Sequence, residues 1–332
     1  MARYFENETG ELVPDALSGF ARAHADLVAY DPRDGFFTAR HSSPARKVGL
    51  LSGGGSGHEP LHIGYVGTGM LDGACPGRVF ASPHNRQIFR ASQAVAGPDG
   101  VLHIVKNYTG DRINFGIAAE RLADEGILCA RVLVDDDLAS DSDEISAGRR
   151  GTGATMLLEK VLGGAADTGM GLEGLMKLGT AVASRCRTLA AASAAHHSPI
   201  TGEPAFELLA GELEYGVGIH GERADRTRKR GSMGALVEDM ADALLDALCP
   251  GPDDPVVALV NGLGSVTSLE LYGIFGELGR VLDARHVRLA RHLVGDYVTA
   301  LDMRGFSLTL MVADRDTLGF YDAPVHTPAL RW

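Results

Sequence analysis

Four polar clusters in the sequence carry residue types that could do chemistry on a small ligand. They are residues 53–59 (GGGSGHE), residues 106–111 (KNYTGD), the aspartates at 135–137, and residues 220–222 (HGE). In open α/β sheets, ligands bind near the carboxyl ends of strands, where loops and helix N-termini meet. Each cluster follows a short apolar run, so we expect all four at such positions.

The first cluster has four glycines within residues 53–57 and ends in His58 and Glu59. Such a run lets the backbone fold tightly and direct N–H groups at an anion or a hydroxyl oxygen. It lacks the Lys-Ser/Thr ending of a Walker A loop, and it matches the dinucleotide fingerprint poorly. A simple turn is the alternative, but the composition favours a ligand-binding loop.

Asp111 follows an expected strand after a short loop and precedes an expected helix. Two interpretations stay open from this spacing: a helix N-cap, or a carboxylate that takes a proton from a substrate hydroxyl. Lys106, at the strand end, could neutralise charge that develops during a reaction, or it could be a solvated edge residue.

His220 lies among small neighbours, in the order Gly218, Ile219, His220, Gly221. A lone histidine is usually structural, but small neighbours would leave its ring open, and a neutral imidazole can attack a carbonyl carbon. The aspartates 135–137 could bind a divalent cation. Consecutive side chains on an extended chain point alternately, so we expect a solvated strand end or a helix cap there, and no metal site.

Alternating strands and helices predict an α/β protein that positions these clusters. Strands are expected at residues 47–51, 101–106, 130–134, 215–219, 256–260 and 306–312. One helix is expected from the 107–111 loop to about residue 125, and two are expected within 151–187, separated by a break near 169–171. Further helices are expected at 236–248 and 266–281. The polar, proline-bearing segment 196–204 indicates a boundary region. We expect two subdomains, 1–192 with the glycine-rich loop and 193–332 with His220, each a mixed or mostly parallel sheet flanked by helices.

Composition restricts the function classes. With 332 residues, 45% of them hydrophobic, the chain can build one large or two ordinary domains. A net charge of −12 argues against nucleic acid or anionic membranes as partners, and we interpret the arginine-rich run 223–230 as a solvated loop. The sequence shows no apolar stretch of membrane-spanning length and no signal-peptide core, and its four cysteines are far apart. We therefore expect a cytoplasmic protein with reduced thiols.

Together these segments resemble the dihydroxyacetone kinase family, in particular its substrate-binding K subunit or K domain. The resemblance is carried by LSGGGSGHEPLHIGYVGTGM (51–70), ACPGRVFASP (74–83), IVKNYTGDRINF (104–115), VDDD (134–137), AGRRGTGATMLLEK (147–160), EYGVGIHGE (214–222), VALVNGLGS (257–265), SLELYG (268–273), LDMRGFSLTL (301–310) and DAPVHTPALRW (322–332). These strings are long and uncommon, and they extend over nearly the whole chain.

The resemblance implies two α/β domains, a homodimer and a phosphotransferase role. By its motif, His220 would add to the ketone of dihydroxyacetone (glycerone) and form a covalent hemiaminal. This capture selects a carbonyl and rejects glycerol. Asp111 would be the general base and His58 a second acid/base or orienting residue, while Gly55, Ser56, Gly57 and Lys106 would line the sugar.

The same resemblance places the nucleotide elsewhere. No cofactor is expected on this chain; ADP or ATP with Mg²⁺ would be bound by a separate L subunit, with or without an M subunit that relays phosphate from phosphoenolpyruvate. Two segments depart from the family pattern, residues 191–198 and Arg223-Ala224, and the first opens a four-carbon ketose such as erythrulose as substrate. A ketose sensor without turnover and a self-sufficient ATP kinase are the remaining alternatives.

Overall fold

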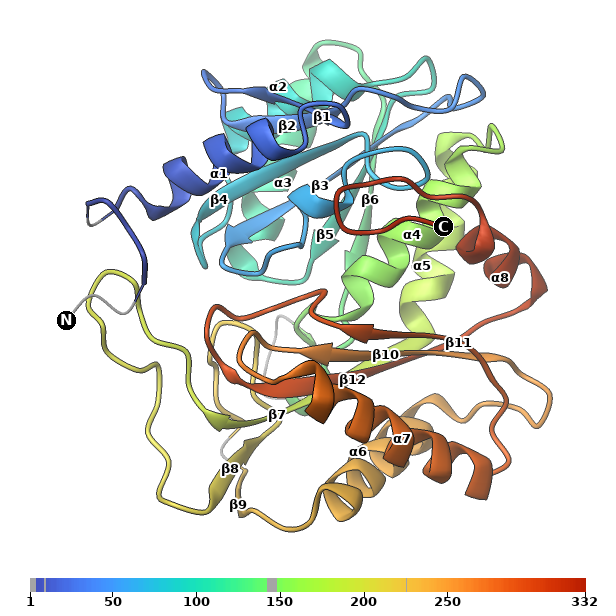
Figure 1. Cartoon of the computed structure of the whole chain (residues 1–332). Coiled ribbons are helices and arrows are strands. Elements are labelled where there is room, and N and C mark those ends of the chain that lie inside the picture. The colour runs from blue at the N-terminus through green and yellow to red at the C-terminus, as the bar shows by residue number, and fades with distance from the viewer. Residues whose placement is uncertain (1–3, 9, 142–147, 225) are drawn as a thin grey trace. The chain divides into compact units, whose positions relative to one another are not determined.

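The computed structural model describes residues 4–8, 10–141, 148–224 and 226–332. Ala147 and Asp225, which belong to two of the runs quoted above, therefore lie outside the described residues. The described chain forms two compact units, each built on a six-stranded sheet (Figure 1). The N-terminal unit comprises residues 4–134, 155–183 and 316–332, and the C-terminal unit comprises 135–154 and 184–315.

The sheet of the N-terminal unit is mixed, with the strand order β1-β2-β4-β3-β5-β6. Its strands are β1 (Val28–Asp31), β2 (Phe36–Ala39), β3 (Gly49–Ser56), β4 (Gly73–Val79), β5 (Val101–Lys106) and β6 (Cys129–Val134). Strands β4, β3, β5 and β6 run parallel to one another, whereas β1 and β2 pair antiparallel at one edge. The parallel set brings the carboxyl ends of β3, β4 and β5 to the same edge of the sheet.

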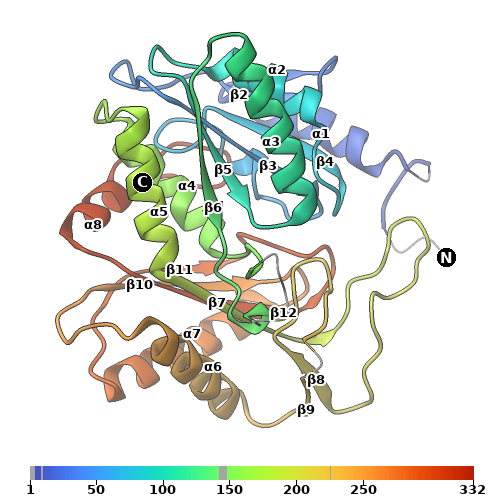
Figure 2. The ribbon, with the colours of Figure 1, turned by 180° about the vertical axis from the view of Figure 1, so that it is seen from behind.

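Six helices of the described residues belong wholly or mainly to this unit. They are α1 (Leu12–Ala23), α2 (Asn85–Val95), α3 (Thr109–Asp124), α4 (Ala154–Ala166), α5 (Leu172–Ser184) and α8 (Arg315–Asp322). Helices α2 and α3 lie side by side against the sheet (Figure 2) and bury Ile88, Phe89 and Phe115 with Leu51 and Val105. Burial of such side chains supplies the main stabilisation of the unit, since each contributes about 1.5–3 kcal/mol.

The C-terminal unit has a mixed sheet in which most neighbours are antiparallel, in the order β11-β10-β12-β7-β8-β9. Its strands are β7 (Cys186–Ala194), β8 (Glu212–Tyr215), β9 (Thr227–Lys229), β10 (Val256–Gly262), β11 (Leu289–Gly295) and β12 (Arg304–Val312). Only β10 and β11 pair in parallel. Two short 3₁₀ helices, Ile63–Tyr65 in the N-terminal unit and Leu138–Ser140 in the C-terminal unit, complete the elements.

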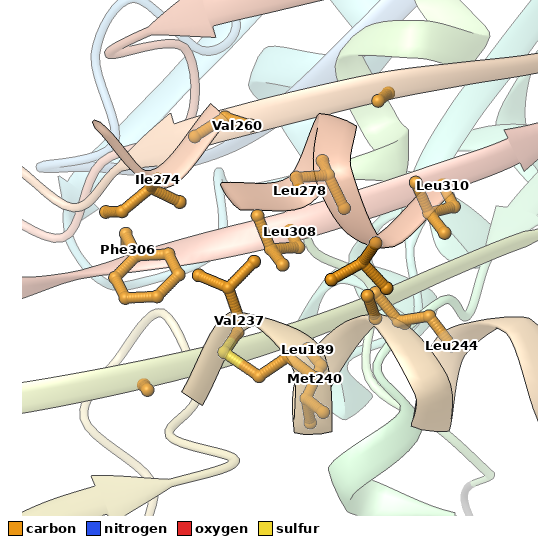
Figure 3. Close-up of a cluster of buried hydrophobic side chains, with 14 of the residues drawn as sticks. Leu189, Val237, Met240, Leu244, Val260, Ile274, Leu278, Phe306, Leu308 and Leu310 are labelled. Carbon is orange, nitrogen blue, oxygen red and sulfur yellow. The ribbon is translucent and has the colours of Figure 1, made fainter. Parts of the chain in front are cut away.

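Helices α6 (Met233–Leu248) and α7 (Ser268–Ala284) pack against each other and against the C-terminal sheet. Figure 3 shows their apolar side chains meeting those of the strands, with Val237, Met240, Leu244, Ile274 and Leu278 on the helices and Leu189, Val260, Phe306, Leu308 and Leu310 on the strands. A capping box between Thr267 and Glu270 fixes the start of α7. The rigid sheet carries the loop that follows β8.

The predicted α/β class, with mixed sheets flanked by helices, is confirmed, and strand β5 has the expected bounds. Two local predictions were wrong. Strand β8 ends at Tyr215, so residues 216–219 lie beyond the strand, and β3 continues through the glycines to Ser56. The compact units also differ from a division after residue 192, because that point lies inside β7, which pairs with β12 on one side and β8 on the other.

Among the described residues, no helix combines the length and the apolar character needed to cross a membrane.

Candidate functional site

The glycine-rich segment is a buried strand rather than an open turn. A Cβ at Gly53 would lie 2.7 Å from the Cys75 carbonyl oxygen, and a Cβ at Gly55 would lie 2.6 Å from the Ala81 nitrogen. Only glycine allows such close approach of neighbouring backbone. The turn comes at Gly57, whose φ of +103° lies in the left-handed region and whose N–H donates to the Glu59 carboxylate at 2.8 Å.

Side chains at the end of β3 are already engaged with the rest of the unit. The Ser56 hydroxyl donates to the Gly77 carbonyl at 2.7 Å. The His58 ring has no exposed surface and stacks on Phe80, with 4.8 Å between ring centroids. His58 is therefore held by packing, which suits an orienting role as well as proton transfer.

Asp111 lies in the first turn of α3, three residues after the N-cap Tyr108, so the N-cap interpretation was wrong. Its side chain is 3% exposed and accepts a hydrogen bond from the Ser82 hydroxyl at 2.5 Å. A carboxylate near a helix N-terminus is favoured by the positive end of the helix dipole. The hydrogen bond from Ser82 thus fixes the Asp111 carboxylate in position.

Lys106 ends β5 and is 1% exposed, so the solvated-edge interpretation was wrong. A Cβ at Gly54 would lie 2.5 Å from its Nζ, which places the ammonium directly against the glycine-rich strand. Segment 80–82 connects the parts of the unit, since it contacts Gly55, His58 and Asp111 through Ala81, Phe80 and Ser82 respectively. The N-terminal unit therefore gathers the predicted substrate residues at the carboxyl ends of β3, β4 and β5.

His220 lies in the C-terminal unit, in the turn after β8, and its side chain is 19% exposed. Its Nδ1 lies 3.0 Å from Glu222 Oε1, and its backbone N–H donates to Glu222 Oε2 at 3.0 Å. Gly221, with φ of +83°, makes the tight turn that lets the carboxylate fold back on the ring. One glutamate therefore fixes both the backbone and the ring of His220.

Charge around Glu222 keeps it ionised. Burial of the Glu222 carboxyl acts to raise its pKa, but the hydrogen bond and charge of His220, with the Arg150 guanidinium, lower the pKa to about 2. Arg150 in turn donates to Asp137 at 2.7 Å through Nε. When the His220 ring is neutral, an ionised Glu222 favours the proton on Nδ1 and leaves Nε2 with a lone pair, the form that a nucleophile needs.

The aspartate segment 135–137 is structural. Asp136 has no exposed surface and accepts from the backbone N–H groups of Thr152 and Ala154 at 2.7 and 2.9 Å, which caps the start of α4. Asp137 accepts from the Ala139 N–H and pairs with Arg150. The helix-cap interpretation is confirmed, whereas a solvated strand end is wrong for these two buried residues. Within the ranges that the structure describes, no group of three or more His, Cys, Asp and Glu side chains could hold a metal ion.

Sequence reasoning missed Ser82, His62 and Glu159, and it placed Glu222 in the cluster 220–222 without giving it a role. Ser82 and Glu222 stand inside the strings quoted above, but their type and spacing gave no signal of a bond to Asp111 or His220. The family roles require His220 to act on the same sugar as Asp111 and His58. His220 belongs to one compact unit and the other two residues belong to the other. That they act together stays a prediction.

Comparison with known proteins gives the family. The Dak1 domain model matches residues 18–329. The protein "PEP-dependent dihydroxyacetone kinase, dihydroxyacetone-binding subunit DhaK" of Escherichia coli (strain K12) is 41% identical over 353 residues, which cover 98% of this chain and 98% of that protein.

Solved structures agree. The dihydroxyacetone kinase of C. freundii aligns with a TM-score of 0.91 and 34% identity, over 100% of this chain and 60% of that one. The "Dihydroxyacetone kinase operon co-activator Dha-DhaQ" aligns with a TM-score of 0.89 and 31% identity, over 97% of this chain and 98% of that one. The resemblance seen in the sequence is thus confirmed, and the chain belongs to the Dak1 domain family.

Proposed function

We propose that this chain is the dihydroxyacetone-binding subunit of a dihydroxyacetone kinase, a phosphotransferase that acts on an alcohol group. The family and the full-length similarity to a subunit of that name support the assignment. The observation that carries the chemistry is the bond between His220 Nδ1 and Glu222, which prepares Nε2 for attack on a carbonyl. Dihydroxyacetone offers such a carbonyl between two hydroxyl groups.

In this proposal, the His220 Nε2 lone pair forms a bond to the ketone carbon. The C=O π electrons move to the oxygen, which takes a proton from water and becomes a hydroxyl, while the imidazole releases its Nδ1 proton by way of Glu222 to water, so that one proton is taken up and one is released. The product is a neutral hemiaminal. Glu222 stabilises the cationic ring that forms on the way, because a carboxylate beside an imidazolium lowers its energy.

Asp111 would then act as general base. It takes the proton of the terminal hydroxyl as that oxygen attacks the γ-phosphoryl group of ATP. The Ser82 hydroxyl, which donates to Asp111 at 2.5 Å, holds the carboxylate in one orientation. The backbone of Gly55, Ser56 and Gly57 and the Lys106 ammonium would bind the sugar oxygens, and His58 would orient the substrate or move a proton.

The remaining parts of the proposal concern partners. The nucleotide, ATP or ADP with Mg²⁺, would be bound by a nucleotide-binding L subunit. The phosphoryl donor would be ATP itself or a phosphoenolpyruvate-driven M subunit that rephosphorylates the bound ADP. We propose a cytoplasmic homodimer, as the family resemblance implies. Erythrulose is the four-carbon substrate to compare with dihydroxyacetone.

Intact-mass measurement after incubation with dihydroxyacetone tests the covalent step. The wild-type chain should gain the mass of one ketose after trapping, glycerol should add nothing, and His220→Ala should lose the adduct. His41→Ala removes an exposed histidine of the N-terminal unit and is the matched control. Retention of the adduct in His220→Ala would contradict the proposed nucleophile.

A second function is supported by the co-activator structure, which aligns over nearly the whole chain. In that case the chain would capture the ketose and bind a transcription regulator without turnover. Mixing the chain with a nucleotide-loaded L subunit and dihydroxyacetone decides between the two. Formation of the sugar phosphate supports the kinase subunit, whereas retained sugar binding without product supports the sensor.

A further inference from the structure

Three residues with no place in the proposed reaction form a buried polar cluster with Lys106. They are Ser52 on β3, His62 in the loop after β3, and Glu159 on α4. Their exposed fractions are 0%, 4% and 0%, and that of Lys106 is 1%. All four belong to the N-terminal unit. Buried ionisable side chains are costly unless their charges compensate one another, so the cluster requires an explanation.

The hydrogen bonds of the cluster fix the tautomer of His62. Its Nδ1 lies 2.6 Å from Glu159 Oε1 and 2.9 Å from Ser52 Oγ. The Ser52 hydroxyl gives its one proton to the Ile104 carbonyl at 2.8 Å, so towards His62 it can only accept. An ionised Glu159 also only accepts. When Glu159 is ionised, Nδ1 must therefore carry the proton, and Nε2 has a lone pair.

That lone pair faces the site of Lys106. His62 Nε2 is buried and has no hydrogen-bond partner among the described residues. A Cβ added to Gly54 would lie 3.0 Å from His62 Nε2 and 2.5 Å from Lys106 Nζ, so both nitrogens face the same point beside the glycine-rich strand. An imidazole lone pair attracts an ammonium, whereas an N–H at that position would repel it.

Lys106 supplies the positive charge of the cluster. Burial raises the pKa of Glu59 and Glu159 and lowers that of His62, and the Lys106 ammonium acts to lower the pKa of all three. Burial is the larger effect on Glu159 and raises its pKa to about 8, against the opposing effect of the Lys106 charge. The ionised form, and with it the Nδ1–H tautomer, therefore becomes populated as the pH rises towards and above that value.

We propose that Glu159 and His62 are positioning residues that hold the Lys106 ammonium against the glycine-rich strand, where it binds a substrate oxygen. Glu159 sets the tautomer of His62, and His62 Nε2 directs Lys106. Only the last step, the contact with the sugar, rests on the proposed function. The cluster thus makes the affinity of the site for a hydroxyketone depend on a glutamate that does not touch the ligand.

The first experiment follows Lys106 itself by NMR. The chain has five lysines, at positions 47, 106, 160, 177 and 229, so selective lysine labelling gives a spectrum in which the Lys106→Met variant assigns the Lys106 signal. In Glu159→Gln, Lys106 should lose its proton at a pH lower by about one unit or more, because an opposite charge has been removed. Lys160→Met, which changes the adjacent and equally buried residue of α4, should leave the Lys106 titration unchanged. An unmoved Lys106 signal in Glu159→Gln would overturn the proposal.

The second experiment measures dihydroxyacetone affinity by titration calorimetry at pH 7 and pH 9. Glu159→Gln should bind about tenfold more weakly than wild type at pH 9, with a smaller difference at pH 7 where Glu159 is mainly protonated. In the Lys106→Met background the same substitution should cause no further loss. Equal losses in both backgrounds would show a purely structural role and overturn the proposal. Absence of sugar binding by wild type would refute the proposed function and the sugar contact, while the lysine titration would still decide the coupling of Glu159 to Lys106.

Discussion

Two neighbouring glycines of β3 allow a test that separates the contribution of the glycine-rich strand to stability from its contribution to ligand binding. Both Gly54 and Gly55 are buried, and alanine adds the same methyl group to each. At position 54 the methyl would meet the ends of two side chains, Lys106 Nζ at 2.5 Å and His62 Nε2 at 3.0 Å. At position 55 it would meet backbone, with Ala81 N and Phe80 Cα both at 2.6 Å.

The two substitutions should therefore separate stability from binding. A lysine end can rotate away, so Gly54→Ala should cost about 1 kcal/mol of unfolding free energy or less but should move the ammonium. Gly55→Ala must push segment 80–82 away from β3, which costs about 3 kcal/mol for an overpacked site. In a unit of this size, about 3 kcal/mol corresponds to a midpoint lower by roughly 6–12 °C.

Differential scanning calorimetry and dihydroxyacetone titration at one pH give both quantities. We expect Gly54→Ala to melt within a few degrees of wild type and to bind the ketose at least tenfold more weakly. We expect Gly55→Ala to melt much earlier. Equal melting temperatures for the two variants would refute the packing argument, and full binding by Gly54→Ala would refute the placement of the ammonium.

Three further predictions follow from charge and burial. Glu222→Gln should slow formation of the His220 adduct by tenfold or more, as seen by time-resolved mass measurement, because the weaker acceptor no longer fixes the Nδ1 proton or stabilises the cationic ring; an unchanged rate would contradict this. Burial lowers the pKa of His103 from 6.5 to about 3, so the unfolded chain gains a proton first and wild type loses stability as the pH falls below 6.5. His103→Leu should reduce that loss of unfolding free energy by about 2 kcal/mol between pH 6.5 and 4.5, as measured by urea unfolding. Equal changes of unfolding free energy with pH in the variant and wild type would count against this prediction. Burial raises the pKa of Glu159 from 4.5 to about 8, so wild type loses stability as the pH rises through that window, and Glu159→Gln should gain up to about 4 kcal/mol over wild type between pH 4.5 and pH 9. The same unfolding assay would contradict this if the difference between the two chains did not change with pH.

The elements that could be predicted from the sequence are those defined by their own residues. The apolar run at 101–106 becomes β5, and the helical stretch 151–187 divides into α4 and α5 around Gly169–Gly171. In both cases the signal is local, because a strand needs a short apolar run and a glycine interrupts a helix. The four polar clusters were visible for the same reason.

Predictions failed where distant segments decide the outcome. The run Gly53–Gly55 suggested a ligand-binding loop, yet it is strand, because β4 and segment 80–82 approach the backbone of Gly53 and Gly55 too closely for a side chain. Asp111 has the type and spacing of a helix cap, but Ser82, 29 positions earlier, makes the bond that fixes it. No periodicity in the sequence reports such a contact.

The sequence by itself determined the α/β class, the positions of the polar clusters and, through the family strings, the substrate class to test. Only the tertiary structure decided which groups act on which. It joined His62 to Glu159 across 97 positions and paired the His220 ring with Glu222 through a tight turn at Gly221. The physical reason is that residue types reveal what chemistry is possible, whereas tautomers and charge states depend on burial and on neighbours that packing alone brings together.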